Sequence, residues 1–360
     1  MLQLLLKTSP VKVISLFGAL VFNWLISLLL PVSDAGLLFA VLSITPGLAI
    51  FMSFGVDQTV LRAGTRRFAD KGYPGLLEVM GYSARSILNR TVLVIVLSVP
   101  VALGLLYLLP QKHDLVLQWF LALAVAPFFA ALLPGAMGYR VQGRYRRSVL
   151  SEPSAVMTFA ALGFGMTCFL IEPQLWVAYA AYGLAIVALS LPLFRTTFTL
   201  STAPVDHDRY FGINELGVYL LQWGIVAQVS FYATSEEIAT ISLSLRMVIM
   251  VNLVLILMGV INNNKISTYI QDGNDIELRS LLRQQFPILF WVGTGSAVVL
   301  GAFAPFGYGF LGQGYENAAG VTLILIVGQL VNVYTAQANI LLNMSGNART
   351  NTIISISVGG

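Results

Sequence analysis

Long apolar runs separated by short polar segments make up most of this chain. A helix needs about 20 mostly apolar residues to cross a bilayer. By that measure we predict ten spanning helices, at 13–31, 36–57, 88–109, 116–138, 149–171, 175–195, 212–233, 239–261, 286–306 and 319–342. An eleventh apolar stretch starts near Asn351 and is cut off at Gly360. This stretch is too short to span a bilayer. The pattern predicts an all-α polytopic membrane protein.

Composition agrees with this pattern and argues against a soluble protein. Charged residues are 10% of the chain, hydrophobic residues are 57%, and mean hydropathy is +0.81, whereas about a quarter of a typical soluble domain is charged. Cys168 is the only cysteine, and His113 and His207 lie far apart, so we expect neither a disulfide nor a metal site. We find no catalytic constellation and expect no enzyme activity, cofactor or nucleic-acid partner.

The basic residues predict the orientation of the chain. With the N-terminus in the cytoplasm, Lys112 falls outside and Arg246 falls within a helix. All other Lys and Arg residues then lie on the cytoplasmic side, as the positive-inside rule requires. Lys7 and Lys12 precede a first apolar run that is too long for a signal peptide, so we expect a retained helix.

Two long inner segments are amphipathic and suggest an internal repeat. In the first, Leu76, Met80 and Ile87 share one helical face, which we expect to rest in the cytoplasmic leaflet. A similar segment, GNDIELRSLLRQQ, follows the eighth helix about 200 residues later. This spacing predicts a six-helix lobe over 1–200 and a lobe over 201–360 with four helices and a stub, with a cavity between them. Because two full repeats need about 400 residues, we expect a chain truncated at its C-terminus.

Three segments carry a resemblance to a known family: GLLFAVLSITPGLAIFMSFGVDQTVLR, SEEIATISLSLRMVIMVNLVLILMGVINN and FLGQGYENAAGVTLILIVGQLVNVYTAQANILLNMSGNART. The chain resembles bacterial polysaccharide exporters, the O-antigen flippases (Wzx-type) of the multidrug/oligosaccharidyl-lipid/polysaccharide (MOP) superfamily, which share a MATE-like two-lobe bundle. The resemblance implies a flippase of the bacterial inner membrane. It would move undecaprenyl-pyrophosphate-linked oligosaccharide to the outer leaflet by alternating access, with membrane lipids and polysaccharide assembly proteins as partners.

Arg246 is the first candidate for a substrate-binding residue. It lies about 8 residues into a helix that enters from outside, or roughly 12 Å deep by helical rise. A charge at that depth should face protein or water rather than lipid. It could meet a phosphate or an acidic sugar in a cavity, or it could form a structural hydrogen bond.

Polar residues on two further helices are also candidates for the cavity. Gln329, Asn332, Asn339 and Asn343 share one face of the tenth helix and could bind sugar hydroxyls or bond neighbouring helices. On the seventh helix Gln222 shares a face with Glu215. Further candidates are grouped by role: ion coupling for Glu215 and Asp57, and capture of the lipid headgroup for Arg62, Arg66, Arg85 and Arg90. Solvated carboxylates and general lipid binding are the alternatives.

Other functions remain open at this stage. A cation-coupled multidrug exporter of the same superfamily is the nearest alternative, although the deepest charge, Arg246, favours an anionic substrate over a cationic drug. Because we expect a truncated chain, a further alternative is that the protein is an inactive remnant of a transporter. A membrane glycosyltransferase or polymerase is disfavoured, because such enzymes need a sizeable loop with clustered acids or histidines.

Overall fold

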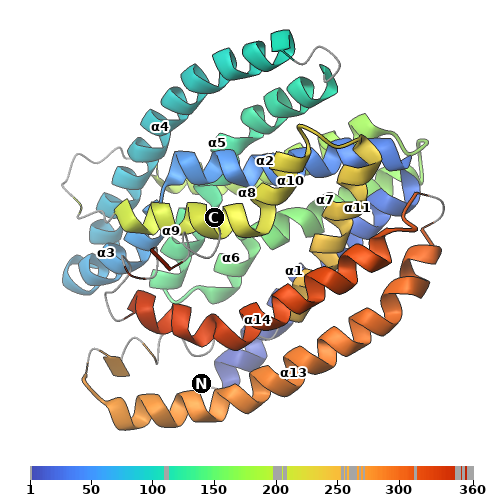
Figure 1. Ribbon diagram of the computed structural model, residues 1–360. Helices are drawn as coiled ribbons and strands as arrows, with labels where there is room; N and C mark the ends of the chain where they lie inside the picture. The colour runs from blue at the N-terminus through green and yellow to red at the C-terminus, as the bar shows by residue number, and fades with distance from the viewer. Residues whose placement is uncertain are drawn as a thin grey trace. The chain divides into compact units, whose positions relative to one another are not determined.

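The structure is a computed structural model (Figure 1). It describes residues 2–108, 113–197, 205, 209–252, 255, 258, 266, 269–270, 272–311, 314–344, 350 and 353–354, although some side chains within these ranges are outside the description.

Every described regular element is a helix, which confirms the predicted all-α fold class. In chain order the elements are α1 (Leu2–Leu29), α2 (Val32–Ser53), α3 (Val56–Lys71), α4 (Tyr73–Leu108), α5 (His113–Val141), α6 (Tyr145–Leu150), α7 (Pro153–Cys168), α8 (Leu175–Thr197), α9 (Arg209–Tyr219), the π-helical turn η2 (Leu220–Gly224), α10 (Ile225–Val229), α11 (Ser235–Val248), the 3-10 turn η3 (Ile249–Asn252), α13 (Asp275–Gly309) and α14 (Ala318–Met344).

Six described helical segments are long and apolar enough to cross a membrane. They are Pro10–Leu29, Val32–Ser53, Tyr73–Gly104, His113–Val141, Asp275–Gly309 and Ala318–Thr335. Pro153–Cys168 and Leu175–Leu191 are shorter apolar helices. The seventh predicted span is broken into α9, η2 and α10, and most of the second half of the eighth lies outside the described residues. So does the eleventh stretch, apart from 353–354.

The chain divides into two compact units, Met1–Ile238 and Ala239–Gly360. The seventh predicted helix belongs to the first unit because α9, η2 and α10 all pack against α2. A functional division into lobes at residue 200 stays a prediction.

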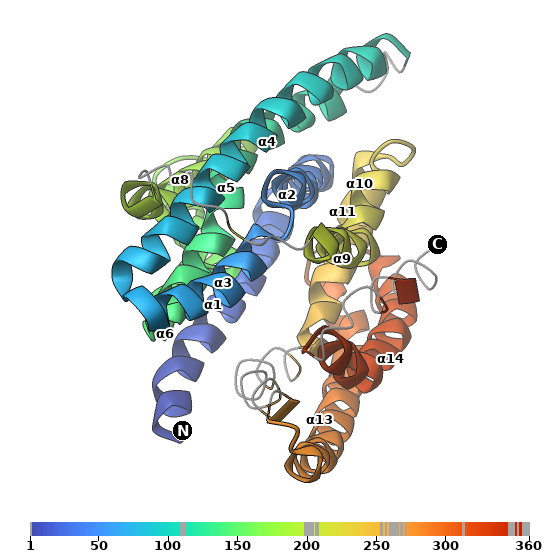
Figure 2. The ribbon, with the colours of Figure 1, turned by 90° about the vertical axis from the view of Figure 1, so that its left-hand side faces the viewer.

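Helix α2 is central to the first unit and packs against α4, α5, α8 and α9. It is apolar on all sides, with Leu38, Phe39 and Leu42 almost fully buried, as expected of a helix surrounded by protein. Helix α1 packs on α7, where Phe22 and Phe164 meet edge to face with ring centroids 6.5 Å apart. Figure 2 shows α3 lying beside α4 and α5 in the same unit.

The first amphipathic segment departs from its predicted place in the lipid leaflet. It is the beginning of the 36-residue helix α4, which continues without a break into the apolar run. Leu76 and Met80 pack with Val56 and Val60 of α3 and with Met137 of α5. The apolar face is therefore covered in part by a helix, α3, that hydropathy alone did not predict as a separate element.

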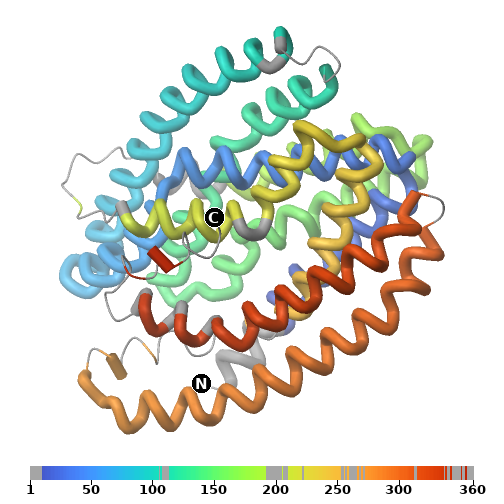
Figure 3. The backbone as a smooth tube through the Cα atoms, in the orientation of Figure 1, coloured from blue at the N-terminus to red at the C-terminus, as the bar shows by residue number. Residues whose placement is uncertain are grey.

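The second unit is built around α13 and α14, which run side by side (Figure 3). The segment GNDIELRSLLRQQ is likewise fused to the apolar run that follows, in the 35-residue helix α13. Hydroxyl pairs join the two helices, with Tyr308 OH 2.7 Å from Thr322 Oγ1 and Thr294 Oγ1 2.7 Å from Tyr334 OH. The unit has a small apolar core, made of Val248, Val251, Leu289, Ala297, Leu300, Ile326 and Val333.

Candidate functional site

A sharp elbow joins α2 to α3. Phe54 (φ 45°) and Gly55 (φ 75°) both adopt left-handed backbone conformations, and Phe54 is the only non-glycine residue with positive φ in the described chain. Such a conformation costs an ordinary residue roughly 1–2 kcal/mol. Arg90 of α4 holds the elbow: its Nη1 donates to Ser53 O at 2.6 Å, and its guanidinium lies over the Phe54 ring.

Helix α9 lies directly against this elbow. A Cβ on Gly212 would fall 2.5 Å from the Phe54 ring, and a Cβ on Gly55 would fall 2.5 Å from the Gly212 nitrogen. Only glycines permit this approach. The Gly55 N–H donates to Glu215 Oε2 at 3.2 Å, so a carboxyl group of α9 is bonded to the backbone of the elbow.

The two candidate ion-coupling residues come together at this point. Asp57 begins the first turn of α3, is 3% exposed, and accepts a 3.0 Å hydrogen bond from Gln58 Nε2. The Glu215 and Asp57 carboxyls interact electrostatically. Asp57 Oδ1 is buried and receives no donor in the described chain. We call these two residues the carboxyl pair.

One turn further along α9, Tyr219 fastens the same helix to α2. Its hydroxyl donates to Ser43 O at 2.9 Å, and the space for its ring exists because residue 47 is a glycine. Gln222 follows in η2, and its side chain lies outside the described residues.

Arg246 lies near the end of α11 in the second unit and is 5% exposed. A buried guanidinium in an apolar helix requires polar surroundings, because desolvating a charge is costly. The nearby polar residues in sequence are Ser242 and Ser244, both fully buried, and Ser244 Oγ donates to Ala318 O of α14 at 3.1 Å.

The polar stripe of the tenth predicted helix is used in part for helix packing. Gln329 Oε1 accepts hydrogen bonds from Asn252 of η3 and from Asn332. Asn332 itself is exposed. The Asn252–Gln329 bond joins two helical segments through their amides, which is the structural alternative to a cavity role. The side chains of Asn339 and Asn343 lie outside the described residues.

The inner-side arginines named as headgroup candidates differ in their exposure. Arg62 and Arg66 are exposed on α3, and Arg85 is exposed on α4. Arg90 is half-buried and donates a hydrogen bond to Ser53 O at the elbow. Capture of a lipid headgroup by these four arginines stays a prediction.

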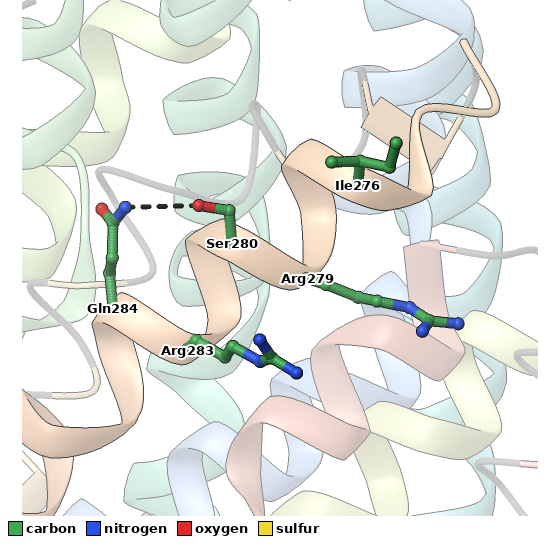
Figure 4. Close-up of a pocket in the computed structure, with 5 residues that line it drawn as sticks. All are labelled: Ile276, Arg279, Ser280, Arg283 and Gln284. Atoms are coloured by element: carbon green, nitrogen blue, oxygen red, sulfur yellow. Dashed lines mark hydrogen bonds between the residues drawn. The ribbon is translucent and has the colours of Figure 1, made fainter.

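The amphipathic start of α13 carries a shallow surface hollow lined by Ile276, Arg279, Ser280, Arg283 and Gln284. Figure 4 shows the Gln284 amide directed at Ser280, with Nε2 and Oγ 3.4 Å apart, and both guanidinium groups on another side of the helix.

No group of three or more potential metal ligands occurs in the described chain.

Sequence reasoning named Asp57 and Glu215 separately but did not predict that they meet. The available signal was their shared depth, since the predicted spans 36–57 and 212–233 place Asp57 and Glu215 near the cytoplasmic ends of their helices. Asn252 was missed altogether, although an amide within an apolar run was visible in the sequence.

Comparison with solved structures identifies the fold. A MATE transporter in the bent conformation matches with a TM-score of 0.65 and 16% identity, covering 98% of this chain and 84% of that one. An outward-facing multidrug resistance MATE family transporter of the MOP superfamily matches with a TM-score of 0.64, 15% identity and the same coverage.

A third similar structure is a MOP superfamily transporter from Pyrococcus furiosus, described as having a binding pocket of reversed polarity that suggests a different function. It matches with a TM-score of 0.63 and 14% identity over 98% of this chain and 84% of that one. No protein-family model and no curated protein matches the chain. The chain therefore has the fold of the MATE transporters among these structures.

Proposed function

We propose that this protein is a flippase that moves lipid-linked oligosaccharide, carried on undecaprenyl pyrophosphate, from the inner to the outer leaflet by alternating access. A pyrophosphate and its sugars cannot cross hydrocarbon unaided, because burying unpaired charged and polar groups is very costly. A protein of this fold that carries such a substrate needs cationic and hydrogen-bonding groups away from lipid.

The burial of the Arg246 guanidinium is the observation that supports this substrate class. This residue is a buried cation in the second unit, near the end of a helix whose acidic residues, Glu236 and Glu237, lie in its first turn. A guanidinium is well suited to phosphate, since its planar donors match two phosphate oxygens. The similar transporter from Pyrococcus furiosus offers a precedent for a pocket of altered polarity within this fold. Exposed Arg62 and Arg66 would meet the headgroup at the inner leaflet.

The proposal is tested by reconstituting the full chain in proteoliposomes with a fluorescent undecaprenyl-pyrophosphate oligosaccharide. We expect translocation faster than in empty vesicles. Arg246→Ala should slow it by about tenfold or more, the usual loss for one charge-assisted hydrogen bond. Arg246→Lys should retain part of the rate, because the charge remains. Arg144→Ala removes an exposed inner arginine and is the matched control, expected to flip at the normal rate.

Cation-coupled multidrug export is the second candidate, and the carboxyl pair of buried Asp57 and half-buried Glu215 is the observation that favours it. The same proteoliposomes loaded with a cationic fluorescent dye distinguish the two. Dye transport without oligosaccharide flipping would contradict the flippase proposal in favour of multidrug export. Normal flipping by Arg246→Ala would contradict the role given to Arg246.

A further inference from the structure

Helix α13 is longer than a membrane requires, and its charged residues are confined to its beginning. Its 35 residues extend over roughly 52 Å by helical rise, whereas the hydrocarbon core of a bilayer is about 30 Å thick. No charged residue follows Arg283 in this helix. Arg283 is therefore the last charge before α13 enters the hydrocarbon, and the turns that precede it belong at the level of the lipid headgroups or beyond.

The aromatic side chains after Arg283 face outward, as lipid-facing residues do. Phe286 is 47% exposed and Trp291 is 71% exposed. The Phe290 ring stacks on Phe286 with centroids 6.5 Å apart and meets Trp291 edge to face at 5.2 Å. It also stacks on Tyr334 of α14 at 5.4 Å. Because Trp and Tyr are enriched at membrane interfaces, these rings place the boundary of the hydrocarbon next to Arg283.

Two arginines lie at this boundary, one turn apart on α13. Arg279 and Arg283 are four residues apart, which places their Cβ atoms about 5–6 Å from each other. Both residues are exposed, and their side chains extend in the same direction from the helix (Figure 4). Neither forms a salt bridge with a described residue. Asp275 and Glu277 lie in the first turn, farther from the apolar run. Both guanidinium groups are therefore available to an anion at the headgroup level.

The hollow around the two arginines offers both polar and apolar contacts. It has a volume of about 430 Å³, and small-ligand sites occupy about 300–1,000 Å³. A guanidinium can donate to two phosphate oxygens at once, and the Ser280 hydroxyl is a further donor in the lining. Ile276 is 82% exposed and adds apolar surface beside the charges. The lining thus combines donors for a phosphate with apolar surface for the part of a lipid next to it.

We propose that Arg279 and Arg283 bind the phosphate of an anionic phospholipid. Its acyl chain lies along the outward side chains of Phe286 and Trp291. The continuous surface from the guanidinium groups to these rings favours a lipid over a soluble phosphate, because a soluble anion would use the charges alone. A lipid with net negative charge is favoured over a zwitterionic one, whose own cation opposes binding to two arginines. The proposal does not depend on flippase activity.

Native mass spectrometry of the detergent-solubilised full chain measures the binding of single lipid molecules. We expect phosphatidylglycerol, which is anionic, to bind more tightly than zwitterionic phosphatidylcholine. Arg279→Gln combined with Arg283→Gln should weaken phosphatidylglycerol binding by about thirtyfold, the combined effect expected of two arginines at a lipid headgroup. The same variant should leave phosphatidylcholine binding unchanged. Arg279→Lys combined with Arg283→Lys should retain part of the affinity, because both charges remain.

The matched control for this measurement is Arg144→Gln combined with Arg147→Gln. It also removes two exposed arginines from the predicted cytoplasmic side, and it should bind phosphatidylglycerol as the wild type does. An equal loss in the control, or equal affinity of the wild type for the two lipids, would overturn the site. Displacement of the lipid by inorganic phosphate at constant ionic strength would also overturn it, because that result indicates a site for a soluble anion.

The path of the acyl chain is tested through the fluorescence of Trp291 in nanodiscs made mostly of phosphatidylcholine. A minor fraction of the lipid carries brominated chains, and the Trp291 signal is the difference between the wild type and Trp291→Phe. We expect brominated phosphatidylglycerol to quench this signal more than the same fraction of brominated phosphatidylcholine. Arg279→Gln combined with Arg283→Gln should remove the excess. Equal quenching by the two lipids would reject the placement. Neither experiment contains oligosaccharide, so a failure of the flippase assay leaves both results interpretable.

Discussion

At the scale of single residues, the first unit contains a buried ionic cluster of Lys12, Glu152 and Arg140. Glu152 bonds both cations, and the Lys12 and Glu152 side chains are about one-tenth exposed. Removing the shared anion would leave Lys12 buried without its counter-charge. We expect Glu152→Gln to lower the free energy of unfolding by about 3–5 kcal/mol, the usual effect of breaking a buried pair. Thermal unfolding of the purified protein in detergent measures it.

The control is Glu78→Gln, which removes the partner of Arg67 and Lys71 on the surface of the same unit. The Glu78 side chain is 33% exposed and that of Lys71 is 60% exposed. Exposed pairs contribute about 1 kcal/mol or less. Equal losses from Glu152→Gln and Glu78→Gln would mean that the Lys12 cluster is solvated rather than buried.

At the scale of elements, α4 is one long helix whose first turns pack on protein. Leu76 is fully buried against α3, whereas Leu88 is 55% exposed on the same helix. We expect Leu76→Ala to destabilise the protein by about 2–5 kcal/mol through the cavity that it leaves. Leu88→Ala should have little effect, because its side chain faces outward. Thermal unfolding would contradict this arrangement if the two variants lost the same stability.

The helices themselves were accessible from the sequence, because the length and apolarity of a run are local properties. Their packing was not. Leu76 and Met80 form an apolar face that a leaflet or another helix could cover, and only the fold selects α3. The carboxyl pair depends on a left-handed Phe54 and on two glycines that let α9 approach, neither of which hydropathy reports. Arg246 could be predicted to avoid lipid, but its surroundings depend on neighbouring helices.

At the scale of the whole molecule, the distribution of charge should fix how the protein is inserted. In the predicted topology the segments that carry Arg62, Arg85 and Arg144 all face the cytoplasm, and these three side chains are exposed. Lys and Arg close to the ends of spanning helices are strong determinants of orientation. The flippase proposal needs this orientation, because headgroup-binding arginines are useful only on the side where the lipid-linked oligosaccharide is made.

Cysteine labelling in intact cells tests this orientation directly. In a Cys168→Ser background, Lys112→Cys should react with a membrane-impermeant maleimide, and Arg144→Cys should react only after the membrane is opened. Both positions lie between predicted spanning helices, so substitution there disturbs little apolar packing. The reverse labelling pattern would place Arg62 and Arg66 outside, where they could not collect a substrate from the inner leaflet. Labelling at both positions from one side would instead mean that the fifth described helix, α5, does not span, since it connects the two sites.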